Sequence, residues 1–221
     1  MLQEFLKKNR KFILIGTVLL GLFYAFSFLV KEDAFTRFDF DMTVKIQANV
    51  STRIDPYLSW FSLLGSFEVT LLILVLFFII KRKVTGIFTI GMFGLMHVVE
   101  LVGKAFLDHP GTPFMFHRYA LDFFFPTSYI QPGGSYPSGH AMRTAFLTVL
   151  FIFFINKRTL RLRSGQAKLS PRMKQLSNGA IIIFYLIMII SRISLGEHWT
   201  SDVIGGTLLG IAFSIFSLVF I

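Results

Sequence analysis

The stretch Phe12–Val30, FILIGTVLLGLFYAFSFLV, contains no charged residue and decides the fold class. A helix of roughly 20 apolar residues can cross the hydrocarbon core of a bilayer, and a helix satisfies its own backbone hydrogen bonds there. Five further apolar stretches of helix length follow it: Ser66–Ile80, Val84–Phe106, Ser138–Ile155, Asn178–Leu195 and Val203–Ile221. We therefore predict an all-α polytopic membrane bundle of six transmembrane helices, with residues 1–221 forming a single domain.

The composition of the chain agrees with a membrane solvent. Of its 221 residues, 54% are hydrophobic and only 15% are charged, against roughly 25% charged residues in a soluble domain. The shortest stretch, Ser66–Ile80, needs its neighbours Trp60–Leu64 to span the hydrocarbon. The sequence has no Cys, which excludes disulfides, thiolate nucleophiles and Cys-ligated metals.

The formal net charge of +10 is distributed unevenly along the chain. Fourteen of the 22 Lys and Arg residues lie before the first stretch, between the second and third, or between the fourth and fifth, whereas only one of the 12 acidic residues, Glu4, lies there. By the positive-inside rule, these segments and both termini are cytoplasmic. Contact with anionic lipid headgroups explains the positive charge, so we predict membrane lipids as partners and no nucleic acid.

The connections between the stretches have distinct compositions. A basic start before Phe12–Val30 is compatible with a cleaved signal peptide, but we expect this span to be retained. The outward connection at residues 31–65 mixes charged and apolar residues, which predicts an amphipathic surface helix around Tyr57–Leu64. The connection Asn156–Ser177 is polar and basic and contains Pro171, so we expect a mobile cytoplasmic connector there.

The segment Tyr136–Arg143 begins one of the predicted helices. Pro137 and Ser138 directly precede an apolar run, and a Ser at this position caps a helix whose first backbone N–H groups are free. Such a terminus binds anions, and His140 on its first turn is placed to donate a proton to a leaving oxygen. The same residues are also compatible with an ordinary capped helix that carries a His at the membrane interface.

A second group of polar residues, Ser191–Asp202, precedes the last predicted helix. His198 and Asp202 are four residues apart, so on a helix Asp202 can accept a hydrogen bond from one imidazole nitrogen and leave the other free as a nucleophile. Arg192 offers two parallel donors to a phosphate or carboxylate. Alternatively, these are snorkelling and capping residues, with Trp199 as an interface anchor.

Two His residues with a carboxylate also suggest a metal site. His109 is the one obvious additional ligand, and the Lys and Arg residues nearby would repel a cation. We therefore expect no metal and no cofactor.

The sequences Pro137-Ser138-Gly139-His140 and Ser-Arg-x5-His-x3-Asp at residues 191–202 resemble the second and third signature motifs of the type 2 phosphatidic acid phosphatase superfamily. The order and spacing of the motifs, and their placement at the outward ends of the last three spans, agree with the family from the third span onward. The resemblance implies a six-helix, metal-independent membrane phosphatase that works through a phosphohistidine intermediate.

The resemblance also implies a role for each matching residue. His198 is the nucleophile, Asp202 is its orienting partner and His140 is the acid that protonates the leaving group. The phosphate binders are Ser138, Gly139 and Arg192. In-line attack on phosphorus needs such a neutral nucleophile on one side, an acid on the other, and fixed positive charge around the three equatorial oxygens.

The first family motif matches only in part. Lys104 is present as a further phosphate binder, but the position of the expected Arg falls on Gly111, so one phosphate-binding cation is missing. His109 stands where the first basic-Pro pair of the motif often begins. We predict that Arg118 or Arg143 folds back to replace the missing guanidinium.

Together these residues predict a lipid phosphatase whose active site opens at the outer face of the cell membrane. The substrate would be a lipid phosphate or a polyprenyl diphosphate that loses its terminal phosphate; phosphatidate and phosphatidylglycerophosphate are candidates of the first kind. Two alternatives stay open: a phosphotransferase that passes the phosphoryl group to another lipid, and a non-enzymatic transport or lipid-binding protein that uses the same cations for headgroup recognition.

Overall fold

The computed structural model describes residues 2–81, 86–119, 121, 123, 125–129, 133–157, 159–162 and 165–221. Their α-helices are α1 (Leu2–Lys31), α2 (Thr36–Asn49), α3 (Asp55–Ser62), α4 (Phe67–Lys81), α5 (Gly86–Phe106), α6 (Gly139–Lys157), α7 (Pro171–Ser194) and α8 (Thr200–Leu218). Between α6 and α7, strands β1 (Thr159–Leu162) and β2 (Gly165–Lys168) form an antiparallel hairpin in which Thr159 pairs with Lys168. Short 3-10 turns occupy Thr52–Ile54, Leu63–Gly65, Phe114–Phe116 and Pro126–Tyr129.

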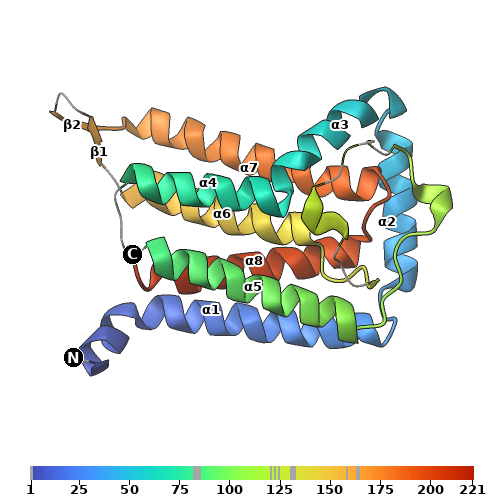
Figure 1. Ribbon diagram of the computed structural model, residues 1–221, viewed down its shortest axis with the longest axis horizontal. Helices are drawn as coiled ribbons and strands as arrows, with labels where there is room; N and C mark the ends of the chain where they lie inside the picture. Colours follow the sequence, from blue (N-terminus) through green and yellow to red (C-terminus); the bar gives the residue numbers. More distant parts are fainter. Residues whose placement is uncertain are drawn as a thin grey trace.

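The helices form a bundle with two different ends (Figure 1). Helices α1 and α4 to α8 run side by side along the long axis, whereas α2 lies across one end of them. Both termini and the β1–β2 hairpin lie at the opposite end. The chain ends and the loop between α6 and α7 therefore share one side of the bundle, as the charge pattern predicts.

Five of the described helices, α1, α5, α6, α7 and α8, are each long and apolar enough to cross a membrane. A sixth span arises when Thr52–Gly65 and Phe67–Ile80 are counted together, although they bend by 51° at Ser66. This agrees with the expectation that the short second stretch recruits Trp60–Leu64. The protein is an integral membrane protein, and the predicted all-α membrane bundle is confirmed, with six spans when the bent pair is counted as one.

Apolar residues cover the outside of the bundle as well as its inside. Helices α1, α4, α5 and α7 expose large apolar side chains, among them Leu14, Ile79, Ile87 and Ile183. A water-soluble monomer rarely exposes such an apolar surface, whereas the acyl chains of a bilayer can cover it. Helix α8 is the central helix, because it packs against α1, α5, α6 and α7 and is largely buried.

Small residues on α8 allow its neighbours to approach closely. A Cβ atom at Gly206 would collide with the backbone carbonyl of Ser138, and one at Gly210 would collide with that of Met142. Both carbonyls belong to the start of α6 or the residue before it. Close backbone contact through small residues is the usual way in which transmembrane helices associate, and here it brings the first turns of α6 and α8 together.

Three expectations about the connections need correction or extension. Helix α7 begins at Pro171, not near Asn178, because Ser170 accepts a hydrogen bond from the Met173 backbone as an N-cap and Pro is favoured in the first turn. With the hairpin before it, most of the predicted mobile connector is regular structure. A helix is present at the predicted segment Tyr57–Leu64, as α3 and the turn after it, and these residues also belong to the bent pair with α4; α2 was not predicted.

Some predicted positions lie outside the described residues. They include Arg82 and Lys83 of the basic turn, and Val84 and Thr85, where the third span was expected to begin. Residues 158, 163 and 164 of the connection before α7 also lie outside.

The arrangement of the chain ends predicts a labelling pattern. A single cysteine at Gly165, in the hairpin, should resist a membrane-impermeant maleimide in intact cells and react after permeabilisation, because the hairpin is expected to be cytoplasmic. A cysteine at Asp41 on α2 should react in intact cells, and the protein has no native thiol to confuse the signal. The reverse pattern would overturn the topology and place the site on the cytoplasmic side.

Candidate active site

The end of the bundle opposite the chain termini gathers the predicted catalytic side chains. Lys104 lies in the last turn of α5, His140 in the first turn of α6, and Arg192 in the last turn of α7. His198 lies in the turn between α7 and α8. His140 is within electrostatic range of the other three side chains. The fold therefore brings residues from four chain segments into one site.

His198 and Asp202 make the contact that their spacing predicts. The Nδ1 atom of His198 lies 3.3 Å from Oδ2 of Asp202, which is fully buried. The same oxygen accepts a hydrogen bond from the backbone N–H of Trp199 at 3.0 Å and one from the Ser135 hydroxyl. His198 precedes α8 rather than opening it, contrary to the prediction, because Asp202 reaches back to cap the helix. The carboxylate is held by several donors and so fixes the imidazole.

The turn that carries His198 is tied to the end of α7. The carbonyl of Arg192 accepts hydrogen bonds from the backbone N–H of Glu197 at 3.0 Å and of His198 at 3.2 Å. Gly196 adopts a φ of 72°, which favours glycine, and any side chain there would collide with the Phe116 carbonyl. Arg192 and His198 therefore keep a fixed relation to each other.

The environment of His198 favours its neutral form. Burial lowers the pKa of His198, and the neighbouring Asp202 acts in the opposite direction without reversing the shift. A neutral imidazole that donates its Nδ1 proton to Asp202 leaves the Nε2 lone pair available. This arrangement can supply a nucleophile near neutral pH.

Two buried side chains of the site, Arg192 and Ser138, carry donors that can bind an anion. The Arg192 guanidinium is fully buried and ion-paired with Glu197, yet within the described residues its Nε and Nη1 atoms have no hydrogen-bond partner. The buried Ser138 hydroxyl also has no partner among these residues. Ser138 directly precedes α6, which begins at Gly139 with free backbone N–H groups. Buried polar groups without partners are costly, so these donors favour an oxyanion ligand.

Lys104 and Arg143 share one buried carboxylate. Lys104 Nζ lies 3.2 Å from Oε1 of Glu100, and Arg143 Nη1 lies 3.5 Å from Oε2 of the same residue. Arg143 also donates from Nε to the Gly65 carbonyl at 2.8 Å. A side chain at Gly139 would collide with the Nη atoms of Arg143, so the guanidinium lies against the start of α6. Arg143 therefore belongs to the same cluster as the predicted phosphate binders.

The structure does not bring Arg118 into this cluster. Its guanidinium donates to the Asp55 carboxylate at 3.1 Å and to the carbonyls of Gln47 and Val50. His109 is close to the site, but it faces Asp202, with Nε2 3.4 Å from Oδ1. Of the two candidates for the missing guanidinium, Arg143 has the better position.

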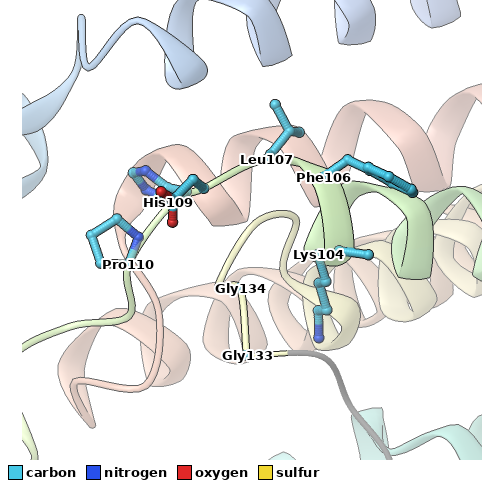
Figure 2. A pocket seen from close by; sticks show the side chains of 9 residues that line it. Lys104, Phe106, Leu107, His109, Pro110, Gly133 and Gly134 are labelled. Carbon is cyan, nitrogen blue, oxygen red and sulfur yellow. The ribbon is translucent and has the colours of Figure 1, made fainter.

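A cavity of about 510 Å³ opens beside the cluster. Figure 2 shows that Lys104 and Phe106 line it from the end of α5, and that His109 and Pro110 line it from the segment that follows. Gly133 and Gly134 contribute backbone without side chains on another side. The cavity therefore opens next to Lys104 and His109.

Two residues that sequence reasoning left out also contact the site. Ser135, which lies just before the Pro137–His140 motif, bonds to Asp202, and Asp39 of α2 bonds to Ser201. A signal for Asp39 was present, because Asp39, Thr43 and Gln47 are spaced four residues apart and share a helix face.

Three cationic side chains lie near His140. In the part of the chain that the structure describes, no three or more His, Asp or Glu side chains are grouped as ligands for a metal ion. The cations Lys104, Arg143 and Arg192 are all close enough to act electrostatically on His140.

Two solved structures have a similar fold. One is a PAP2-type phosphatidylglycerolphosphate phosphatase from Bacillus subtilis, with a TM-score of 0.71 and 19% identity over 92% of this chain and 94% of that chain. The other is LpxE from Aquifex aeolicus, with a TM-score of 0.56 and 22% identity over 82% of this chain and 94% of that chain. A comparison with curated proteins found no match.

The sequence also matches a family model. The PAP2 superfamily model covers residues 71–221, which is more than half of the chain and includes all four segments that form the site. The chain belongs to the PAP2 superfamily, whose phosphatases hydrolyse phosphate esters.

Proposed function

We propose that residues 1–221 form one catalytic domain, a metal-independent lipid phosphatase that acts through a phosphorylated His198. The observation that carries this proposal is the position of the His198–Asp202 pair beside the buried, incompletely bonded guanidinium of Arg192. A nucleophile with a fixed tautomer next to unpartnered anion donors is the arrangement that phosphoryl transfer needs.

The first chemical step forms a bond between Nε2 of His198 and the phosphorus atom. The bond between phosphorus and the leaving oxygen of the lipid breaks, and a protonated His140 gives that oxygen its proton and becomes neutral. Asp202 keeps the Nδ1 proton of His198 in place and stabilises the positive charge that develops on the ring. The products of this step are the dephosphorylated lipid and phosphohistidine.

The second step returns the enzyme to its starting state. A water molecule gives its proton to the now neutral His140 and attacks the phosphorus atom. The bond between phosphorus and His198 breaks, and inorganic phosphate is released. Throughout both steps Arg192, Lys104 and the amide groups at the start of α6 stabilise the equatorial oxygens.

A lipid substrate suits the location of the site. The catalytic side chains lie at the ends of membrane-spanning helices, and the cavity beside them has apolar Phe106 and Leu107 next to polar Lys104 and His109. The similar Bacillus subtilis protein is a phosphatidylglycerolphosphate phosphatase. We propose a lipid phosphate or polyprenyl diphosphate as the substrate, bound from the outer leaflet of the cell membrane, with both termini cytoplasmic.

The mechanism predicts a covalent label on His198. Purified protein in detergent with EDTA should turn over a ³²P-labelled lipid phosphate and release free phosphate. Quenching with alkaline SDS should trap an acid-labile, base-stable label that maps to the peptide containing His198. His198→Ala should lose both label and turnover, because no other imidazole in the described residues has an equivalent carboxylate partner four residues away.

The matched variant for this experiment is His140→Ala. It should still accept phosphate from an aryl phosphate whose leaving group needs no proton, while losing activity on lipid phosphates. Label on His140, full activity of His198→Ala, or loss of activity in EDTA would contradict the proposed mechanism.

The positions of the two arginines predict unequal effects. Arg143→Gln removes a cation from the cluster and should cost about 2–4 kcal/mol of transition-state stabilisation, measured as a fall in kcat/KM. Arg118→Gln removes a contact with Asp55 and α2. It should therefore lower Tm while leaving kcat/KM close to that of the wild type.

The double variant Glu100→Gln/Arg143→Gln is the control for the first of these effects. In Arg143→Gln the Glu100 carboxylate loses its arginine partner, and the double variant removes that carboxylate as well. If the single variant lost phosphate stabilisation, kcat/KM should stay low in the double variant. Recovery in the double variant, or Arg143→Gln within about threefold of wild type, would show that Arg143 does not replace the missing cation.

A further inference from the structure

Helix α2 lies outside the family match yet contacts the site. It precedes residue 71, where that match begins, and crosses the end of the bundle at which the catalytic side chains gather (Figure 1). Asp39 and Thr43 are buried on one face of α2, whereas Asp41 on another face is exposed. Nothing in the signature motifs involves this helix. Its buried polar face therefore requires its own explanation.

Asp39 binds the first turn of α8. Its carboxylate accepts hydrogen bonds from the Ser201 backbone N–H at 2.7 Å and from the Ser201 hydroxyl at 2.6 Å. Burial raises the pKa of Asp39, and the two bonds from Ser201 act against this shift. Ser201 is directly followed by Asp202. The carboxylate of Asp39 thus holds the backbone from which the partner of His198 projects.

His109 links the same two residues from another side. Its Nε2 atom lies 3.4 Å from Oδ1 of Asp202 and 3.5 Å from the Ser201 hydroxyl oxygen. A continuous polar path therefore runs from Asp39 through Ser201 and His109 to Asp202. A displacement of Ser201 would disturb both the backbone and the side-chain surroundings of Asp202.

Helix α2 is also fixed on the other side of the His198 turn. Gln47 donates from Nε2 to the carbonyl of Ser194, at the end of α7, at 3.0 Å, and to that of Phe116 at 2.7 Å. The bonds from α2 therefore reach Ser194 before the turn and Ser201 after it. This helix can hold the two ends of the turn at a constant separation.

We propose that Asp39 is a positioning residue for the His198–Asp202 pair, and that α2 is part of the catalytic unit of this protein. This inference rests on the proposed role of His198. Without the Asp39 carboxylate, the N–H and hydroxyl of Ser201 lose their buried acceptor and the first turn of α8 becomes free to shift. A misplacement of about 1 Å in a catalytic group can cost on the order of 10²-fold in rate.

The test compares two carboxylates on the same helix with p-nitrophenyl phosphate as the probe. Asp39→Ala should lower kcat at least about 30-fold and leave KM within about threefold, because the substrate-binding cations are unchanged. Asp41→Ala removes an exposed carboxylate that pairs with Arg37, and kcat should stay at the wild-type value. Asp39→Asn, which keeps an acceptor oxygen for the Ser201 N–H, should recover most of the loss.

A double-variant measurement distinguishes positioning from a general loss of structure. If Asp39 acts through Asp202, Asp39→Ala should cost little further activity in an Asp202→Asn background. If Asp39→Ala does not fold, Ser201→Ala, which removes only the hydroxyl bond, replaces it and should lower kcat about three- to tenfold. A kcat for the Asp39 or Ser201 variant equal to that of Asp41→Ala, or a loss additive with Asp202→Asn, would overturn the inference.

The outcome is separable from that of the proposed mechanism. The kcat comparison needs no phosphoenzyme, whereas the mechanism depends on label at His198. A labelled His198 with an inert Asp39 would remove the inference alone, and absence of label would remove the mechanism whatever the Asp39 variants do.

Discussion

The buried carboxylate of Asp202 is the interaction on which the site depends. Its side chain accepts from His198, from the Trp199 backbone and from Ser135, and its carbonyl accepts from the Ser138 backbone at 3.0 Å. One residue therefore orients the imidazole, caps the start of α8 and fixes the residue that precedes α6. A buried carboxylate is tolerated only with such a set of donors. The same donors also hold the Asp202 carboxylate in one position.

The packing of α8 makes this arrangement possible. Gly206 and Gly210 allow the backbones of α6 and α8 to touch, so the two helix starts lie side by side. Tyr136 fills the space beside Gly205 and its hydroxyl hydrogen-bonds with that of Ser27 on α1. The apolar contacts inside the bundle thus hold the polar end together, while the apolar surface of the outer helices contacts lipid.

Much of this structure could be predicted from the sequence, and the reasons are local. A long apolar run with no charge favours a span, and the His198–Asp202 spacing gives a contact that holds even though α8 starts after His198. The boundaries that depend on single capping residues, such as the start of α7 at Pro171, were missed. Contacts between segments far apart in the chain could not be predicted from the sequence either. Whether Arg118 or Arg143 faces the site depends on Asp55 and Glu100, which tertiary packing alone brings to them.

The central claim is that His198 attacks a phosphorus atom held between Arg192, Ser138 and the start of α6. An experimental structure of the protein with orthovanadate, which adopts the trigonal bipyramidal geometry of the transferring phosphoryl group, tests this most directly. We predict a bond between vanadium and Nε2 of His198, an apical oxygen facing His140, and equatorial oxygens in contact with Arg192 and Ser138. Vanadate bonded to His140, or bound away from His198, would contradict the account.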